Sequence, residues 1–241
     1  MPRIYVEIEL TSGAECALPA TAAHHVRDVL RLERGAELVL FNGRGGEYEA
    51  QLLAVGRAEV RAVLGVFRHR AVESPLAVTL VQSISRGERM DYTIQKAVEL
   101  GVHHIVPVTS TRTVVRLDSA REEKRLEHLR GIVRHAAEQS GRIAVPEVTS
   151  VLSLTAWLAQ ANNTRAYMLD PFATTSLAAQ AAPVGAVAIV AGPEGGFSGD
   201  ERAQMARAGV IAVRLGPRVL RTETAALCAL TIAQMRWGDL G

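Results

Sequence analysis

The sequence holds few residues of several types, and each shortage disfavours a class of protein. Cys16 and Cys228 are the only cysteines among 241 residues, and neither has a CxxC or other metal-ligand spacing. We therefore expect no disulfide and no metal site. No apolar run approaches the roughly 18 to 20 residues of a membrane span, and the N-terminus has no signal-peptide pattern. These absences predict a cytoplasmic protein with no membrane partner.

Several catalytic motifs are also missing. The sequence contains no GxSxG nucleophile elbow, no GxxxxGK[ST] phosphate-binding loop and no GxGxxG dinucleotide fingerprint. Four of the seven histidines form two adjacent pairs, at 24–25 and 103–104, and neighbouring side chains point apart. Serine-dependent hydrolysis, nucleotide hydrolysis and metal binding by these histidines are therefore disfavoured.

Arginine carries nearly all of the positive charge, since Lys96 and Lys124 are the only lysines. The net charge of +2 is too small to predict a polyanionic partner, so the distribution of the arginines matters more. Four groups are candidates for a phosphate-binding track: Arg27, Arg31 and Arg34; Arg68 and Arg70; Arg86 and Arg89; Arg112 and Arg116. Each group alone is more simply a solvated surface, so a track requires the groups to converge in space.

The periodicity of the sequence changes near residue 75, which predicts an α/β protein of two domains, 1–70 and 75–241. The first part alternates polar and apolar residues over short segments, as a mostly β module does, with one short helix capped by Thr21. The second part alternates strands with helices, which is typical of a mostly parallel sheet. Strands are expected at 4–10, 37–41, 48–54, 58–67, 76–82, 104–108, 165–169, 185–191 and 211–215, and helices at 21–32, 88–100 and 119–140. Two pairs have capping-box spacing, Ser85 with Glu88 and Ser198 with Glu201.

Two loops of unusual composition follow apolar strands near the C-terminus. The segments 192–198, GPEGGFS, and 215–225, LGPRVLRTETA, each place glycine and proline between a strand and a helix. Glycine lets a ligand lie against the main chain, and amides at a helix start can donate hydrogen bonds to it. Two such loops at strand C-termini predict one shared ligand crevice. A third segment, HAAEQSGR at 135–142, is a polar helix end that is either a C-cap or part of a functional site.

Taken together, these segments resemble the bacterial 16S ribosomal RNA uridine-N3 methyltransferases of the SPOUT superfamily. The resemblance covers the whole chain and rests on five motifs in order: HHVRDVLRLERGAELVLFNGRGGEY, RGERMDYTIQKAVELGV, HAAEQSGR, GPEGGFS and LGPRVLRTETA. It implies an N-terminal PUA-like RNA-binding β-barrel domain and a C-terminal SPOUT α/β methyltransferase domain with a deep trefoil knot. It also implies a homodimer that binds S-adenosylmethionine (SAM) and acts on 16S ribosomal RNA of the small ribosomal subunit.

The resemblance assigns a cofactor pocket to a strand end and to both loops. The residues of this pocket are Leu169, Asp170, Gly192, Pro193, Glu194, Gly195, Gly196, Leu215, Gly216, Leu220, Arg221 and Thr222. The reaction is a direct displacement by N3 of uracil, whose weakly acidic proton must leave. Arg221 is the candidate for electrostatic stabilisation, and either Glu223 or Glu138 for proton removal. Glu223 is equally well explained as a charge at a helix N-terminus.

The resemblance also implies contacts with RNA, for which the candidate residues are Arg27, Arg31, Arg86, Arg112, Arg116 and Arg142. Two other functions are open at this point. One is a noncatalytic RNA-binding assembly factor that keeps the fold, and the other is a SPOUT enzyme that acts on transfer RNA. The intact loops at 192–198 and 215–225 argue against the first, and the motifs at 24–48 and 86–102 argue against the second.

Overall fold

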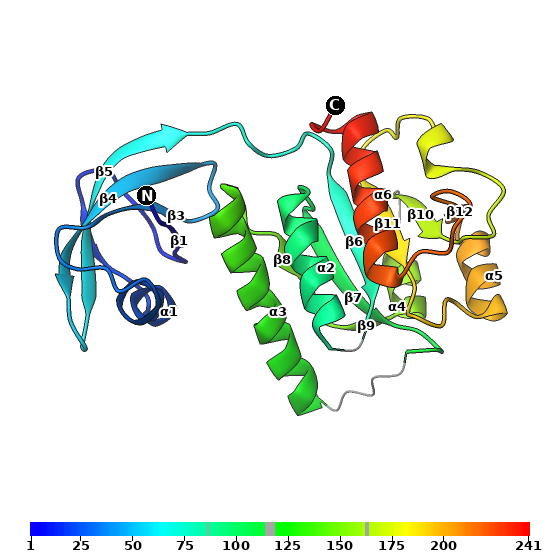
Figure 1. The fold of residues 1–241 in the computed structure, drawn as a ribbon, viewed down its shortest axis with the longest axis horizontal. Coiled ribbons are helices and arrows are strands. Elements are labelled where there is room, and N and C mark those ends of the chain that lie inside the picture. Colours follow the sequence, from blue (N-terminus) through cyan, green and yellow to red (C-terminus); the bar gives the residue numbers. More distant parts are fainter. Residues whose placement is uncertain (86, 114–118, 162–163) are drawn as a thin grey trace. The chain divides into compact units, whose positions relative to one another are not determined.

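The computed structural model describes residues 1–85, 87–113, 119–161 and 164–241. The candidate RNA contacts Arg86 and Arg116 lie outside the described residues. The chain divides into two compact units (Figure 1). The N-terminal unit comprises residues 1–73 and 137–145, and the C-terminal unit comprises residues 74–136 and 146–241. The segment 137–145, which we expected within the second domain, therefore clusters with the first.

The N-terminal unit is built on a five-stranded sheet in the order β1-β3-β4-β5-β2. Its strands are β1 (Arg3–Tyr5), β2 (Glu15–Ala17), β3 (Glu37–Phe41), β4 (Gly46–Val55) and β5 (Val60–His69). Alternation buries one face, since Leu38 and Leu40 of β3 are fully buried while Glu37 is exposed. β1 is shorter than the expected strand at 4–10. β1 pairs with β3, and the last bond of this pairing runs from the amide of Val6 to the carbonyl of Phe41. The pairing stops there because β3 ends at Phe41.

A short helix of the N-terminal unit, α1 (Ala20–His24), continues as a π-helical turn over His25–Val29. The predicted N-cap at Thr21 is wrong. The N-cap is Pro19, two residues earlier, so the helix begins at Ala20 and no side chain caps it. Arg31, which follows, has φ +52° and is the one described residue other than glycine with a positive φ.

The C-terminal unit is a seven-stranded sheet in which every pairing is parallel. The order is β12-β10-β11-β6-β7-β8, and β9 also pairs with β7. The strands are β6 (Val78–Ser83), β7 (His104–Thr109), β8 (Glu147–Val148), β9 (Leu152–Ser153), β10 (Arg165–Leu169), β11 (Val187–Ala191) and β12 (Ile211–Val213). All five residues of β11 are buried, as expected of a central parallel strand covered on both faces.

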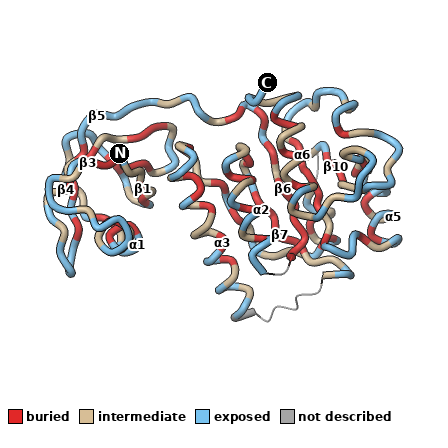
Figure 2. The backbone as a smooth tube through the Cα atoms, in the orientation of Figure 1, coloured by how far each residue is buried: buried red, intermediate tan, exposed pale blue. Residues whose placement is uncertain are grey.

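In the described part of the chain, five α-helices accompany the strands of the C-terminal sheet: α2 (Glu88–Glu99), α3 (Ser119–Ser140), α4 (Leu154–Gln160), α5 (Gly199–Arg207) and α6 (Thr222–Trp237). A 3-10 turn lies at Leu177–Ala179. Figure 2 shows buried residues along β6 and β7 and alternating burial along α2 and α6, which pack against each other. The last turn of α3 belongs to the N-terminal unit.

One of the two predicted capping boxes is confirmed. At α5 the Ser198 hydroxyl accepts from the amide of Glu201, and the Glu201 carboxylate accepts from the amide of Ser198. The box predicted at Ser85 is wrong, because Gly87 with φ +60° stands at the N-cap of α2 and turns the chain between Ser85 and the helix. The trefoil knot stays a prediction. None of the described helices combines the length and apolarity needed to cross a membrane.

Candidate functional site

A cavity of about 630 Å³ opens at the carboxyl ends of β10, β11 and β12. Strand ends of a parallel sheet are where ligands bind in such folds, because the loops that follow them meet there. The cavity is lined by Met168 to Phe172 after β10, by Ala191 to Phe197 after β11, and by Val213, Leu215, Arg218 to Glu223 and Ala225 after β12. Arg89, Arg112 and Arg202 complete the lining.

The loop after β11 is held in a defined shape. The amide of Gly196 donates to the carbonyl of Pro193 at 2.9 Å, and Gly196 has φ +66°, a conformation that favours glycine. A Cβ at Gly192 would lie 3.1 Å from the Phe197 ring, so a side chain there would press on that ring. Nη1 of Arg112 donates to the carbonyl of Gly195 at 2.8 Å. The main chain of this loop therefore faces the cavity in one fixed arrangement.

The loop after β12 reaches the same cavity and is joined to the first loop. The Thr222 hydroxyl, at the start of α6, donates to the carbonyl oxygen of Gly192 at 2.6 Å. Thr222 in turn accepts a hydrogen bond at 3.1 Å from Nε2 of Gln82, on β6. The two loops thus share both a cavity and a hydrogen-bonded contact.

All of the cofactor residues that the resemblance implies line this cavity except Gly216. Among the lining residues that the sequence did not single out, Phe172 and Val219 are apolar yet 80% and 74% exposed. Exposed apolar side chains at a cavity rim are suited to cover an apolar ligand. Val219 lies within the segment 215–225, although it was not among the predicted cofactor residues, whereas Phe172 stands outside every motif and carries no sequence signal that would have identified it.

Asp170 organises the loop after β10. Its Oδ1 accepts from the amide of Phe172 at 2.9 Å, and its Oδ2 lies 3.3 Å from Nη1 of Arg202, on α5. The amide of Asp170 donates to the carbonyl of Val213, the last residue of β12. The carboxylate therefore anchors the loop that carries Phe172 and joins it to α5.

Positive charge dominates the wall of the cavity. Five arginines line it, at 89, 112, 202, 218 and 221, against three carboxylates, at 170, 194 and 223. Glu194 pairs with Arg89 and Asp170 with Arg202, at 3.3 Å in both cases. Within the described part of the chain, Arg218 and Arg221 form no ion pair and both are exposed. These two guanidinium groups are placed to meet an anion.

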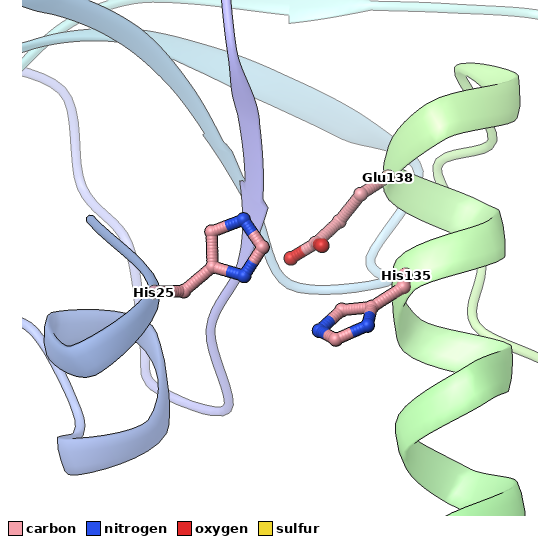
Figure 3. Close-up of side chains that lie close together, drawn as sticks. All are labelled: His25, His135 and Glu138. Atoms are coloured by element: carbon pink, nitrogen blue, oxygen red, sulfur yellow. The ribbon is translucent and has the colours of Figure 1, made fainter. Parts of the chain in front are cut away.

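The two candidate carboxylates for proton removal lie in different places. Glu223 lines the cavity, and its Oε2 is buried without a hydrogen-bond partner among the described residues. Glu138 belongs to the N-terminal unit and does not line the cavity, and its Oε1 accepts from the amide of Tyr5 at 2.9 Å. Figure 3 shows Glu138 directed toward His25, also of the N-terminal unit, with His135 one turn earlier on α3. Of the two carboxylates, Glu223 is the one at the cavity.

Arg142, a candidate RNA contact, is buried inside the N-terminal unit. Its Nη2 lies 2.5 Å from the Glu73 carboxylate, and its side chain is only 6% exposed. Glu73 also accepts hydrogen bonds from the amides of Ile143 and Ala144, each at 3.0 Å. Burial alone would raise the pKa of Glu73, but these bonds and the Arg142 charge outweigh it and lower that pKa below its ordinary value. We therefore assign Arg142 a structural role in place of the expected contact with RNA.

The other described candidates for RNA contact are exposed or partly exposed. Arg112 lies at the cavity, and Arg31 is exposed in its positive-φ conformation. Arg27 is engaged, since it donates to both carboxylate oxygens of Asp28 and to the carbonyls of Gly56 and Arg57. Arg112 is exposed but donates to the carbonyl of Gly195, whereas the exposed guanidinium of Arg31 forms neither an ion pair nor a hydrogen bond with the described residues.

The buried carboxylate of Glu201 fixes the loop that carries Arg112. Besides its capping bond, Glu201 accepts a hydrogen bond at 2.7 Å from the amide of Thr111. Burial alone would raise the pKa of Glu201, but the hydrogen bonds from Ser198 and Thr111 outweigh this and lower it. The start of α5 and the loop after β7 are thereby joined, which steadies Arg112 against Gly195.

Comparison with protein families covers most of the chain. Residues 72–234 match the RNA methyltransferase domain family, and residues 18–64 match the RNA methyltransferase PUA domain family. The ribosomal RNA small subunit methyltransferase E of Buchnera aphidicola from Schizaphis graminum is 31% identical over 100% of this chain and 98% of its own. The protein of the same name from Mycobacterium bovis is 37% identical over 94% of this chain and 88% of its own.

Several solved structures resemble the whole chain, among them two that contain SAM. A methyltransferase from Legionella pneumophila in complex with SAM has a TM-score of 0.94 at 38% identity, over 99% of this chain and 98% of its own. The ribosomal RNA small subunit methyltransferase E from Neisseria gonorrhoeae, bound to S-adenosyl methionine, has a TM-score of 0.93 at 38% identity, with both chains fully covered. By sequence and by fold, the chain belongs to the family of RNA methyltransferases with a PUA domain that includes the ribosomal RNA small subunit methyltransferases E.

Proposed function

We propose that the protein transfers a methyl group from SAM to N3 of a uridine in the 16S ribosomal RNA of the small subunit. The observation that carries the proposal is the single cavity into which the loops after β10, β11 and β12 all project. Relatives that this chain matches over nearly their whole length are named ribosomal RNA small subunit methyltransferases E, and one of them was solved with SAM bound, as was a further methyltransferase of the same fold.

The residues of the cavity fit SAM in size and in chemistry. Its volume of about 630 Å³ is typical of a small-molecule site. Leu169, Leu215 and Leu220 offer apolar walls for an adenine ring, while the fixed main chain of 192–196 offers hydrogen-bonding groups. Bound there, SAM supplies an electrophilic methyl group on a sulfonium cation. The orphaned carboxylate oxygen of Glu223 and the exposed Arg221 stand beside this space.

The chain's own residues supply positioning and charge. N3 of uracil carries a weakly acidic proton that must leave as the nitrogen attacks. We assign the removal of this proton to Glu223 and the stabilisation of the uracil anion to Arg221. The rigid loops contribute by keeping the nitrogen, the methyl carbon and the sulfur in line, because alignment is a large part of the barrier to a displacement between two bound reactants.

We further propose that the protein acts as a homodimer. One face of α6 leaves apolar side chains uncovered: Leu227 and Ile232 are half-buried, and Met235 is 59% exposed. Tyr92, on α2, is also 51% exposed, and α2 packs against α6. An apolar surface on adjacent helices fits a second copy of the chain. Light scattering coupled to size exclusion tests this, and a monomer at micromolar concentration would contradict it.

The proposed activity is tested with labelled SAM. We would incubate the protein with small ribosomal subunits, with naked 16S RNA and with transfer RNA, and then analyse nucleosides by mass spectrometry. The expected product is N3-methyluridine in 16S RNA, either in the subunit or free. Label in transfer RNA alone would favour a different substrate. Calorimetric binding of SAM without turnover on any RNA would favour a noncatalytic factor.

A further inference from the structure

Gln82 is a buried polar residue beneath the cavity. It lies on β6, in the middle of the sheet, in register with Ala191 of β11 and Pro107 of β7. Only 1% of its surface is exposed, and it does not line the cavity. Its Nε2 donates to the Thr222 hydroxyl and to the carbonyl of Ser83, both at 3.1 Å. Burying a side-chain amide costs free energy unless hydrogen bonds replace those it made to water.

The donor and acceptor roles around the Thr222 hydroxyl are fixed, because it accepts one hydrogen bond and donates another. The carbonyl of Gly192 can only accept, so the Thr222 hydroxyl donates its single proton there, at 2.6 Å. The hydroxyl must then accept from Gln82, which requires the NH₂ group of the amide to face it, as it does. We call this chain of bonds, from Gln82 to Thr222 to Gly192, the amide relay. It joins β6, the first residue of α6 and the first residue of the loop after β11.

The relay joins the two cavity loops at their bases. Gly192 and Thr222 both line the cavity, and each is the point at which a loop meets a secondary-structure element. This arrangement has a cost in stability, because Oε1 of Gln82 is buried without a hydrogen-bond partner among the described residues. A leucine or methionine would fill the same space without that orphaned oxygen, but it could not hold Thr222.

We propose that Gln82 is a positioning residue that sets the affinity of the cavity for SAM through Thr222 and Gly192. The inference rests on the proposed function, because it takes SAM as the ligand of the cavity. Without the amide, the Thr222 hydroxyl keeps its bond to the carbonyl of Gly192 but loses the donor that orients it, so the two loop bases are held less firmly. Part of the binding free energy of SAM is then spent on ordering these loops, so SAM binds more weakly.

The chain offers a matched control in Gln234. This residue is fully buried on α6, and its Nε2 donates to the carbonyls of Leu100 and Gly101, at 3.0 and 3.3 Å. Its Oε1 accepts from the hydroxyl of Ser74 at 2.6 Å. It is the same residue type with the same burial in the same unit, but it does not line the cavity or touch either loop. Gln234→Met therefore reports the general cost of removing a buried amide.

The experiment compares SAM binding by calorimetry with the melting temperature for Gln82→Met, Gln234→Met and the unaltered protein. We expect Gln82→Met to weaken SAM binding roughly three- to tenfold, the equivalent of one hydrogen bond. We expect Gln234→Met to lower the melting temperature by at least as much and to leave SAM affinity unchanged. Equal affinity in Gln82→Met and the unaltered protein would overturn the inference, as would an equal loss in both variants.

A double-mutant cycle adds a result that a purely structural role would not produce. Thr222→Val removes the hydroxyl at constant shape, and Thr222→Ser keeps it. Because the relay is one unit, adding Gln82→Met to Thr222→Val should cost no more affinity than Thr222→Val alone, and Thr222→Ser should lose less. Additive losses would overturn the inference.

If Gln82→Met does not fold, the difference between Thr222→Val and Thr222→Ser decides the question. Failure of the unaltered protein to bind SAM would overturn the proposed function and this inference together, whereas normal binding in Gln82→Met overturns this inference alone.

Discussion

The guanidinium of Arg142 lies 2.5 Å from the carboxylate of Glu73, joining residues 69 positions apart within the N-terminal unit. Nε of Arg142 also donates to the same carboxylate at 2.9 Å, so two guanidinium nitrogens bind one carboxylate oxygen. The other oxygen of Glu73 accepts from the amides of Ile143 and Ala144. This pair, with the hydrogen bonds from Arg3 to the carbonyl of Arg142 and from the amide of Tyr5 to Glu138, joins the segment 137–145 to the rest of the N-terminal unit.

Breaking this pair, in which Arg142 is buried and Glu73 is 22% exposed, is expected to destabilise the protein. Arg142→Ala leaves the Glu73 carboxylate without its cation, and we expect a loss of about 3 kcal/mol in the free energy of unfolding, measured in urea. The control is Arg44→Ala, in the same unit, where Arg44 pairs with Glu9 on an exposed surface. That change should cost less than about 1 kcal/mol. A loss of RNA affinity in folded Arg142→Ala without loss of stability would instead support a contact with RNA.

The lowered pKa of Glu73 makes stability depend on pH. Unfolded, this carboxyl takes up a proton near its ordinary value of 4.5, whereas in the folded protein it stays charged to a lower pH. Its contribution is therefore complete above pH 4.5 and is lost as the pH falls through the folded value. We expect the difference in unfolding free energy between the unaltered protein and Glu73→Gln to shrink only below pH 4.5. A difference that is constant from pH 7 to pH 3 would contradict this.

Sequence periodicity predicted the elements that are long enough to repeat an apolar pattern. The helices at 88–100 and 119–140 agree with α2 and α3 to within one residue, because long helices repeat their apolar face several times. The two-residue strands β8 and β9 and the short helix α4 were not predicted. Their pairing with β7 and their packing depend on tertiary contacts, which so few residues cannot encode locally.

The candidate site was predictable where glycine and proline mark the loops, and unpredictable at its rim. Phe172 stands in a loop that no motif marks, and only the folded chain places it at the cavity, whereas Arg218 lies within the segment 215–225 but was not among the predicted cofactor residues. Sequence also could not separate Glu223 from Glu138, because each is a carboxylate near a helix end. Nor could it show that Arg142 is buried, since the partner Glu73 is remote in sequence.

A substitution at Arg31 can test RNA binding without lowering the stability of the fold. Its φ of +52° is unfavourable for arginine and natural for glycine, so Arg31→Gly should fold at least as stably as the unaltered protein. If the exposed guanidinium meets a phosphate, Arg31→Gly should weaken binding to 16S RNA and reduce the slope of log affinity against log salt by about one. Filter binding at several salt concentrations measures both. An unchanged slope would exclude a phosphate contact by Arg31.

The choice between the two carboxylates is decided by kinetics under single-turnover conditions. Glu223→Gln keeps the shape of the side chain and removes its basicity, so we expect the methyl-transfer rate to fall about 10²- to 10⁴-fold with little change in SAM affinity. Glu138→Gln should change the rate by less than about threefold, because its carboxylate lies outside the cavity, bonded to the amide of Tyr5. A raised pH should restore part of the rate in Glu223→Gln, since hydroxide then removes the N3 proton before attack. If Glu138→Gln is the slower enzyme and Glu223→Gln is unimpaired, the assignment of the base to Glu223 is wrong.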